Sequence, residues 1–184
     1  MYKIKTLNNQ AGKSVREIVF GVEDGLVTTL GLTAGVAISI NSNNIVIISA
    51  IAGMVAGAVS MAAGTYLSSK TQLEFLKTEH KNKKELKFLK SHFDTPSQAA
   101  IVIFLFYLLG GIIPIFPYAF LTVKSALSTS ILLTVVSLFL VGCWKTKLTK
   151  RSWLKSGLEM VLVGILAALI GYLIGTIATY YTGI

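Results

Sequence analysis

Five stretches of mostly apolar residues alternate with short polar segments along the chain. They cover residues 17–40, 44–69, 97–121, 126–144 and 156–181. A helix that crosses the hydrocarbon core of a bilayer needs about 20 such residues, so each stretch is long enough to span a membrane once. Pro114 and Pro117 fall in the third stretch, where we expect a kink whose freed backbone groups are satisfied by neighbouring helices. The pattern predicts an all-α integral membrane protein with five transmembrane helices.

The composition agrees with this prediction and narrows the class of function. Hydrophobic residues make up 53% of the chain and charged residues 14%, whereas soluble domains carry about 25% charge. A net charge of +9 would suggest nucleic acid as the partner of a soluble protein, but here the basic residues gather beside the apolar stretches. Nothing resembles a nucleophile triad, a zinc-ligand cluster or a phosphate loop. We therefore expect neither an enzyme nor a nucleic-acid-binding protein.

The basic residues predict the orientation in the membrane. Sixteen of the seventeen lie on one side: four before the first stretch, seven between the second and third, and five between the fourth and fifth. Only Lys124 lies on the other side. Because Lys and Arg accumulate in cytoplasmic loops, the N-terminus is expected in the cytoplasm and the C-terminus outside.

Two polar segments flank or interrupt the predicted membrane domain of residues 17–184. Residues 1–16 form a cytoplasmic N-terminal segment without the features of a cleavable leader. Residues 70–96 form a short basic cytoplasmic segment. Within it, Gln72–Leu89 has the apolar spacing of an amphipathic helix, which would extend the second span and rest near anionic lipid headgroups.

An acidic pair, Glu23 and Asp24, lies inside the first apolar stretch. An ionisable side chain at membrane depth costs a few kcal/mol and marks an ion or proton path in many proteins. No basic residue lies between Arg16 and Lys70. The charge of these acids must therefore be balanced by another helix, a proton or a bound cation.

Met61 is the predicted companion of Asp24. Asp24 lies eight residues after Arg16, and Met61 lies eight residues before Ser69 at the basic end of the second stretch. At 1.5 Å per residue, both lie about 12 Å from the same membrane boundary. A carboxylate and a thioether together suit a borderline transition-metal ion better than sodium or calcium. The competing interpretations are gap-filling packing for Met61 and an interhelical hydrogen bond or N-cap role for Asp24.

Helical periodicity adds further candidates for the ion or proton path. Thr28 shares a face with Asp24, and Gly31 and Gly35 continue that face. Met160 lies on a glycine-rich face of the fifth stretch. Small residues at such spacing let helix backbones approach closely in lipid. Glu23 points about 100° away from Asp24 and could reach another interface. Glu159 lies four residues after Lys155, so we expect a Lys–Glu pair there.

Four segments of the sequence resemble the vacuolar iron transporter family. They are FGVEDGLVTTLGLTAG (20–35), AGMVAGAVSMAAGTYLSSKTQLE (52–74), GGIIPIFPYAF (110–120) and VGCWKTKLTKRSWLKSGLEMVLVGILAALIGYLIG (141–175). The resemblance covers nearly the whole chain from Ser14. It implies a five-helix homodimer that exports Fe²⁺, and often Mn²⁺, from the cytoplasm in exchange for protons, without a permanently bound cofactor. It places the ion path between the subunits, with the family's first-span Asp at Asp24 and its second-span Met at Met61.

The chain departs from the family pattern at two places. Many members carry a Glu where this chain has Gly53, and many read GEY where it has Gly64, Thr65 and Tyr66. Members with a long acidic cytoplasmic insert also use it to collect metal, whereas residues 70–96 are short and net basic. The sequence therefore predicts a short form without that metal-binding insert. Lower affinity, changed selectivity or a different substrate would follow.

Two other functions fit the same features. One is a small proton-coupled exporter of organic cations, in which Tyr107, Phe116 and Tyr118 line a cavity. The other is a non-transporting membrane scaffold that kept the fold. The short length and the composition favour the cell membrane of a prokaryote, or a vacuolar-type membrane if the source is eukaryotic.

Overall fold

A computed structural model describes residues 14–79, 95–149 and 152–182. The described chain is helical apart from its connections. Its elements are α2 (Val15–Ser39), α3 (Asn43–Glu79), α5 (Pro96–Ile115), the 3₁₀ helix η1 (Phe116–Ala119), α6 (Val123–Thr149) and α7 (Trp153–Thr182). All five α-helices are long and apolar enough to cross a membrane. The prediction of a five-helix membrane protein is confirmed at this level.

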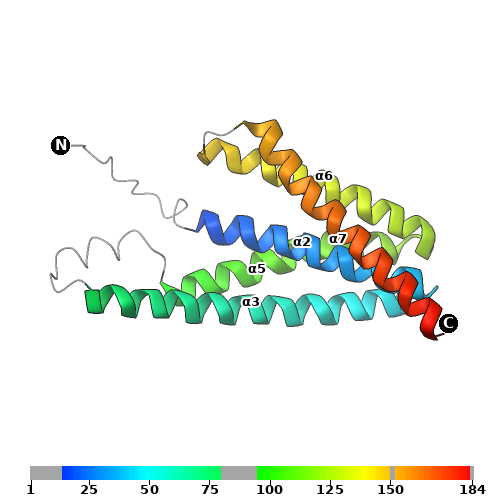
Figure 1. Ribbon diagram of the computed structural model, residues 1–184, viewed down its shortest axis with the longest axis horizontal. Coiled ribbons are helices and arrows are strands. Elements are labelled where there is room, and N and C mark those ends of the chain that lie inside the picture. The colour runs from blue at the N-terminus through cyan, green and yellow to red at the C-terminus, as the bar shows by residue number, and fades with distance from the viewer. Residues whose placement is uncertain (1–13, 80–94, 150–151, 183–184) are drawn as a thin grey trace.

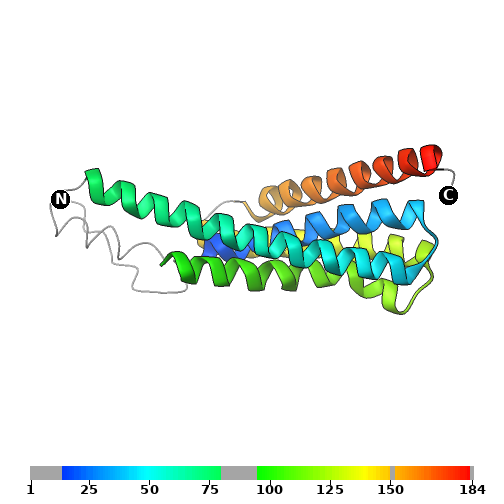
Figure 2. The same ribbon diagram turned by 90° about the horizontal axis from the view of Figure 1, so that it is seen from below.

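The helices lie side by side and run alternately between the two ends of an elongated bundle (Figures 1 and 2). The start of α2, the end of α3, the start of α5, the end of α6 and the start of α7 share one end. This end is called the basic end, because it carries every described basic residue except Lys124. α2 lies at the centre and contacts α3, α5, α6 and α7. The acidic pair of the first apolar stretch is therefore on the central helix.

The helix α3 continues well past its predicted end at residue 69. It is 37 residues long, or about 55 Å, and extends beyond the other helices at the basic end (Figure 2). Leu73 and Leu76 on this extension line a small pocket together with Arg16, Glu17 and Ala99. The apolar positions of the expected amphipathic helix thus face α2 and α5 as far as Glu79. Residues 80–94, the rest of that expected helix, lie outside the described residues.

The prolines of the third stretch end a helix in place of bending it. Pro114 is the last residue but one of α5, and Pro117 lies in η1. Proline lacks an N–H group, so it cannot donate the usual hydrogen bond to the preceding turn. The Ser130 hydroxyl of α6 donates to the Pro114 carbonyl over 2.8 Å. This bond ties α6 to the end of α5, but it does not involve the carbonyls of residues 110 and 113 that the two prolines leave without their usual donors.

Glycines allow the central helix to approach its neighbours closely. A Cβ atom at Gly25 would lie 3.0 Å from the carbonyl carbon of Tyr107, and one at Gly171 would lie 2.9 Å from that of Gly31. Both positions therefore require a residue without a side chain. The Ser39 hydroxyl adds a hydrogen bond of 2.9 Å from α2 to the Gly175 carbonyl of α7. The glycine-rich faces of the first and fifth stretches thus pack on each other within one chain.

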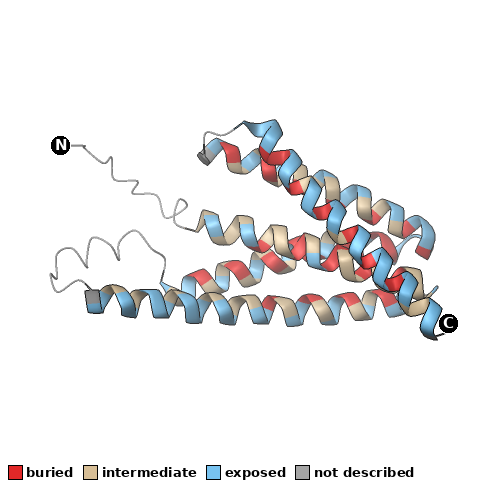
Figure 3. Ribbon diagram, in the orientation of Figure 1, coloured by how far each residue is buried: buried red, intermediate tan, exposed pale blue. Residues whose placement is uncertain are grey.

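Figure 3 shows buried residues on the inward faces of the helices and exposed ones on their outward faces. On α7, for example, Leu162, Leu166 and Leu173 are more than half exposed. Outward-facing leucines on a helix of this length are suited to contact with lipid tails. The burial pattern therefore agrees with a bundle surrounded by hydrocarbon.

Asn43 joins the two connections at the end opposite the basic end. Its amide nitrogen donates to the carbonyls of Tyr118 (2.8 Å) and Leu121 (2.6 Å). We expect Asn43→Ala to destabilise the protein by about 1–3 kcal/mol, because both carbonyls lose their partner. Thermal unfolding in detergent measures this effect, with Asn44→Ala as the matched control on the exposed side of the same turn. An equal melting temperature for the two variants would contradict the assignment.

Candidate functional site

Asp24 lies near the middle of α2 and is half-buried. One helical turn further along, the Thr28 hydroxyl donates to Asp24 Oδ1 over 3.2 Å. The two side chains can meet because residues four apart share a helix face. Thr28 thus holds the carboxylate in one orientation and leaves its second oxygen available. An oriented carboxylate with a free oxygen is suited to binding a cation or a proton.

Tyr107 of α5 reaches the same pair from the neighbouring helix. Its side chain is buried, and its hydroxyl lies near Thr28 and Asp24. On its other side, the Tyr107 hydroxyl lies against Gly57 of α3. A Cβ atom at Gly57 would lie 2.8 Å from Cζ of the Tyr107 ring. Gly57 therefore provides the space into which Tyr107 extends. Tyr107 connects the Asp24 region of α2 with α3.

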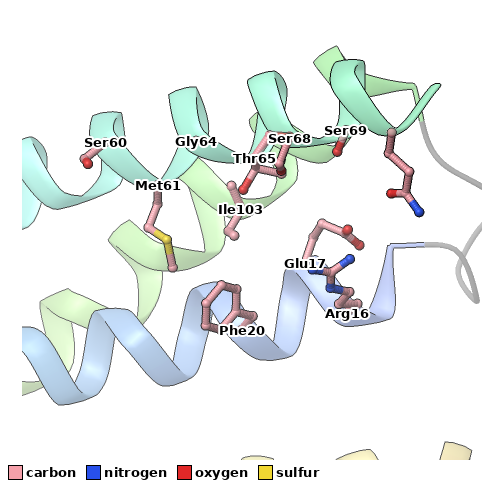
Figure 4. A pocket seen from close by; sticks show the side chains of 11 residues that line it. Arg16, Glu17, Phe20, Ser60, Met61, Gly64, Thr65, Ser68, Ser69 and Ile103 are labelled. Atoms are coloured by element: carbon pink, nitrogen blue, oxygen red, sulfur yellow. The ribbon is translucent and has the colours of Figure 1, made fainter. Parts of the chain in front are cut away.

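Met61 lies one helical turn from Gly57 on α3. It packs against the apolar cluster that contains Tyr107, and its side chain points from α3 toward α2 (Figure 4). Met61 also lines a pocket that Asp24 does not line. Met61 thus faces that pocket from α3, whereas Asp24 lies further along α2, and the equal depth expected from the sequence stays a prediction.

This pocket, called the α2–α3 pocket, lies between α2 and α3 toward the basic end and has a volume of about 340 Å³. Its lining is rich in hydroxyl groups, as Figure 4 shows. The α3 residues are Ser60, Met61, Gly64, Thr65, Ser68, Ser69 and Gln72, and the others are Arg16, Glu17, Phe20 and Ile103. Oxygen ligands suit hard and borderline cations. The pocket can therefore receive a hydrated cation from the basic end.

Glu17 is the acid of this pocket, and the sequence analysis did not single it out. Its Oε2 atom is buried and has no hydrogen-bond partner. A buried carboxylate oxygen without a partner is costly, so a cation or a proton would stabilise it. The signal in the sequence was its spacing: Glu17 lies seven residues before Asp24, which places the two on one face of a helix. We overlooked it because it falls at the membrane boundary.

Glu23 faces another neighbour. Lys145, near the end of α6, is close enough for its charge to act on the Glu23 carboxylate. The packing of α2 on α6 agrees with this proximity, because Val19 and Val22 of α2 join the same apolar cluster as Leu138 and Val141 of α6. The sequence required a partner from another helix, a proton or a cation for these acids. For Glu23 the structure supplies a lysine from α6.

The remaining candidates of the fifth stretch lie elsewhere. Met160 is buried in an apolar cluster with Leu26 and Leu138. Glu159 is exposed on α7, and among the described residues it forms no ion pair with Lys155. Neither lines the α2–α3 pocket. The structure therefore holds Asp24 and Thr28 together, places Met61 in the α2–α3 pocket, and leaves Glu159 and Met160 outside both.

The positions of the two absent acids differ in their surroundings. A Cβ atom at Gly53 would come within 2.5 Å of a methyl group of Leu32. Thr65, in contrast, lines the α2–α3 pocket, and a Cβ at the neighbouring Gly64 would meet nothing within 4 Å. Leu32 thus fills the space that an acid at position 53 needs, whereas position 65 has room for one.

The three aromatics of the organic-cation alternative do not share a cavity. Tyr107 is buried beside Thr28, and Tyr118 is buried in a separate cluster with Val46 and Ala126. Phe116 is 58% exposed and lines a third site with Phe120 and Leu133. This arrangement gives no aromatic enclosure for an organic cation.

The described part of one chain does not contain a cluster of acidic, histidine or cysteine side chains that would hold a metal ion. Across the described ranges, no group of three or more His, Cys, Asp or Glu side chains lies close enough to hold a metal ion. A site built on Asp24 and Met61 needs further ligands, such as hydroxyls, water or residues of another copy.

Comparison with known proteins assigns the chain to a family. The model of the VIT family matches residues 15–88 and 83–176, which together cover most of the chain. The chain belongs to the VIT family. The resemblance seen in the sequence is thereby confirmed.

Several relatives in this family are similar over most of the chain. Vacuolar iron transporter 1 of Eucalyptus grandis is 28% identical over 208 residues, covering 86% of this chain and 84% of the relative. Vacuolar iron transporter homolog 3 of Arabidopsis thaliana is 31% identical over 159 residues, covering 86% and 80%. Protein CCC1 of Saccharomyces cerevisiae is 28% identical over 212 residues, covering 84% and 66%.

These VIT family alignments also bear on the predicted short form. In the Eucalyptus alignment, 86% of 184 residues is about 158, so about 50 of the 208 aligned positions have no counterpart here. The Arabidopsis homolog 3 alignment is almost free of such positions. The two segments matched by the family model meet at residues 83–88, between α3 and α5. This junction agrees with an absent insert between the second and third spans.

Proposed function

We propose that this protein is a homodimeric transporter that moves Fe²⁺ or Mn²⁺ out of the cytoplasm in exchange for protons. The names of its VIT family relatives support iron as the cargo. The observation that carries the proposal is the geometry at Asp24. An oriented carboxylate lies at membrane depth beside Tyr107, and Met61 faces the α2–α3 pocket from α3.

The ion would enter through the α2–α3 pocket. The unpartnered oxygen of Glu17 and the hydroxyls of α3 would replace part of its hydration shell. Asp24 lies seven residues further along α2, or about 10 Å deeper. Met61 lines the pocket on this route, and its thioether favours transition ions over Mg²⁺ and Ca²⁺. The route therefore has one acid at its entrance and one at its deep end.

Proton exchange would take place at Asp24. The deprotonated carboxylate binds the ion, and protonation removes its charge when the ion leaves. The Thr28 and Tyr107 hydroxyls can donate to the carboxylate or accept from its protonated form. Glu23 lies near Lys145, whose positive charge would balance it, so we assign the exchange to Asp24. One carboxylate would thus alternate between cation and proton.

A second copy of the chain would complete the site. Thr28 and Ser60 are exposed at membrane depth, and Asp24 is only half-buried. Polar groups that face hydrocarbon find no hydrogen-bond partner there. A partner subunit against this face would cover them and add its own Asp24 and Met61, so that two chains supply the ligands that one chain lacks.

The dimer proposal has a direct test. In a Cys143→Ser background the chain has no other cysteine, so Thr28→Cys introduces the sole thiol. We expect mild oxidation in membranes to give a disulfide-linked dimer, because Thr28 lies on the proposed shared face. Non-reducing gel electrophoresis measures it, with Leu166→Cys on the outward face of α7 as the control. Equal cross-linking at both positions would contradict the proposed interface.

Transport is tested with the purified protein in liposomes. Fe²⁺, Mn²⁺, Co²⁺ and Zn²⁺ are supplied in turn while a pH-sensitive dye reports proton movement. Metal-dependent proton flux with Fe²⁺ or Mn²⁺ supports the proposal. Flux driven only by organic cations would identify the alternative exporter, and the absence of any flux or specific metal binding would identify a scaffold.

A further inference from the structure

A group of cationic and aromatic side chains lies where α6 ends and α7 begins. It consists of Trp144 and Lys147 on α6, and Trp153 and Lys155 on α7, and is called the Trp–Lys corner. Trp144 is 42% exposed and Trp153 is 58% exposed. Both lysines are exposed as well. These are the only two tryptophans of the chain.

The position of the Trp–Lys corner relative to a bilayer follows from the helices. The apolar span of α6 ends at Lys147, and that of α7 begins at Trp153. The corner is at the basic end of the bundle, level with the start of α2 (Figure 1). Tryptophan rings prefer the boundary between hydrocarbon and headgroups. Lysines there extend their ammonium groups to headgroup level.

Packing holds the corner in place. The backbones of α6 and α7 approach so closely that a Cβ atom at Gly142 would lie 2.7 Å from the Cα atom of Gly157. The Trp153 ring packs edge-on against Phe139, with ring centroids 6.3 Å apart and an interplanar angle of 78°. These contacts fix the end of α6 and the start of α7 relative to each other.

The lysine charges of the corner have no acidic partner among the residues that the structure describes. In the described ranges neither Lys147 nor Lys155 forms an ion pair, and Glu159, one turn along α7, is not bonded to Lys155. Ammonium groups at headgroup level attract phosphate oxygens. Tryptophan rings beside them pack against the upper part of an acyl chain. Trp144 and Lys147 are three residues apart and share a face of α6, so this face matches both parts of one lipid molecule.

We propose that the Trp–Lys corner binds an anionic phospholipid, with Lys147 at its phosphate and headgroup, the Trp144 ring along an acyl chain, and Lys155 and Trp153 on the adjoining end of α7. Lys70 and Lys77 on the α3 extension are exposed too, but no tryptophan lies on that helix. The combination of both features singles out the α6–α7 end. This inference requires a bilayer but does not depend on metal transport.

Tryptophan fluorescence tests the proposal, because all of it comes from the corner. The full-length protein is placed in vesicles of one fixed mixture of phosphatidylglycerol and phosphatidylcholine. In one preparation the phosphatidylglycerol carries dibrominated acyl chains, which quench nearby tryptophan, and in the other the phosphatidylcholine carries them. Since both vesicles have the same surface charge, only the identity of the adjacent lipid differs. We expect stronger quenching per brominated lipid when phosphatidylglycerol is the carrier.

Charge removal sharpens the result. Each lysine near an anionic surface is worth about fivefold in lipid occupancy, so Lys147→Gln/Lys155→Gln should weaken the preference for phosphatidylglycerol by about 25-fold. The matched control, Lys70→Gln/Lys77→Gln, should retain it, and Lys147→Arg/Lys155→Arg should restore it.

Equal quenching by the two lipids in the wild type would overturn the proposal, as would an unchanged preference in the corner variant. Loss of the preference on adding soluble inorganic phosphate would show a free anion site and would also overturn it. Before the variants are compared, gel filtration and thermal unfolding in detergent confirm that each of them is folded.

Discussion

Asp24→Asn is expected to reduce metal-dependent proton flux in proteoliposomes by about 100-fold or more, since changes in the residues that merely orient metal ligands already cost 10–100-fold. The amide keeps the shape of the side chain and can still accept from the Thr28 hydroxyl, which is 3.2 Å away. It loses the negative charge that binds the ion and the ability to take up a proton. Binding and exchange should therefore fail together while the fold persists.

Glu23→Gln is the matched control for this variant. It removes a carboxylate at the adjacent position of the same helix, but Glu23 is directed toward Lys145. We expect flux close to that of the wild type. Unchanged flux in Asp24→Asn, or an equal loss in both variants, would show that Asp24 has no special role in transport.

Thr65→Glu is expected to increase metal affinity. Thr65 lines the α2–α3 pocket, which also contains Glu17, so the new carboxylate adds a second negative charge and another oxygen ligand. Cation sites gain affinity with ligand charge, and we expect the Kd for Mn²⁺ to fall by about tenfold, which corresponds to about 1.4 kcal/mol. Titration calorimetry in detergent measures it, with Thr65→Gln as the uncharged control of equal length.

Gly53→Glu provides the contrasting case. Leu32 already occupies the space beside Gly53, so a Glu there must displace the end of the Leu32 side chain, and we expect it to raise affinity less than Thr65→Glu does. Reducing the neighbour as well, in Gly53→Glu/Leu32→Ala, should remove this cost and increase affinity further. No gain in Thr65→Glu, or an equal gain in Gly53→Glu alone, would contradict this description of the pocket.

The contrast between positions 53 and 65 also explains how the chain departs from the family pattern. At Gly53 the missing acid is accompanied by a leucine that fills the vacant space. At Thr65 the pocket remains open and keeps a hydroxyl. The proposed site therefore relies on Glu17 and Asp24, which makes each of them more important than in a relative with more acids.

The sequence predicted the helices and their order because hydrophobic length is a local property. Twenty apolar residues specify a span whatever lies beside them. The charges at the helix ends gave the distance of Asp24 and Met61 from one boundary, since the rise per residue is fixed. Helix ends were less predictable: α3 continues to Glu79 because Leu73 and Leu76 find partners on α2 and α5.

The sequence by itself determined properties of each helix taken separately. These are the five spans, their alternation, and the depth and helix face of each polar side chain. The tertiary structure decided which faces meet. It placed Tyr107 against Thr28 and Gly57, Lys145 beside Glu23, and Glu17 in the pocket with Met61. Periodicity fixes the direction of a side chain on its own helix. The rotation of that helix against its neighbours depends on how all five surfaces pack together, and glycines such as Gly25 and Gly171 set how closely they approach.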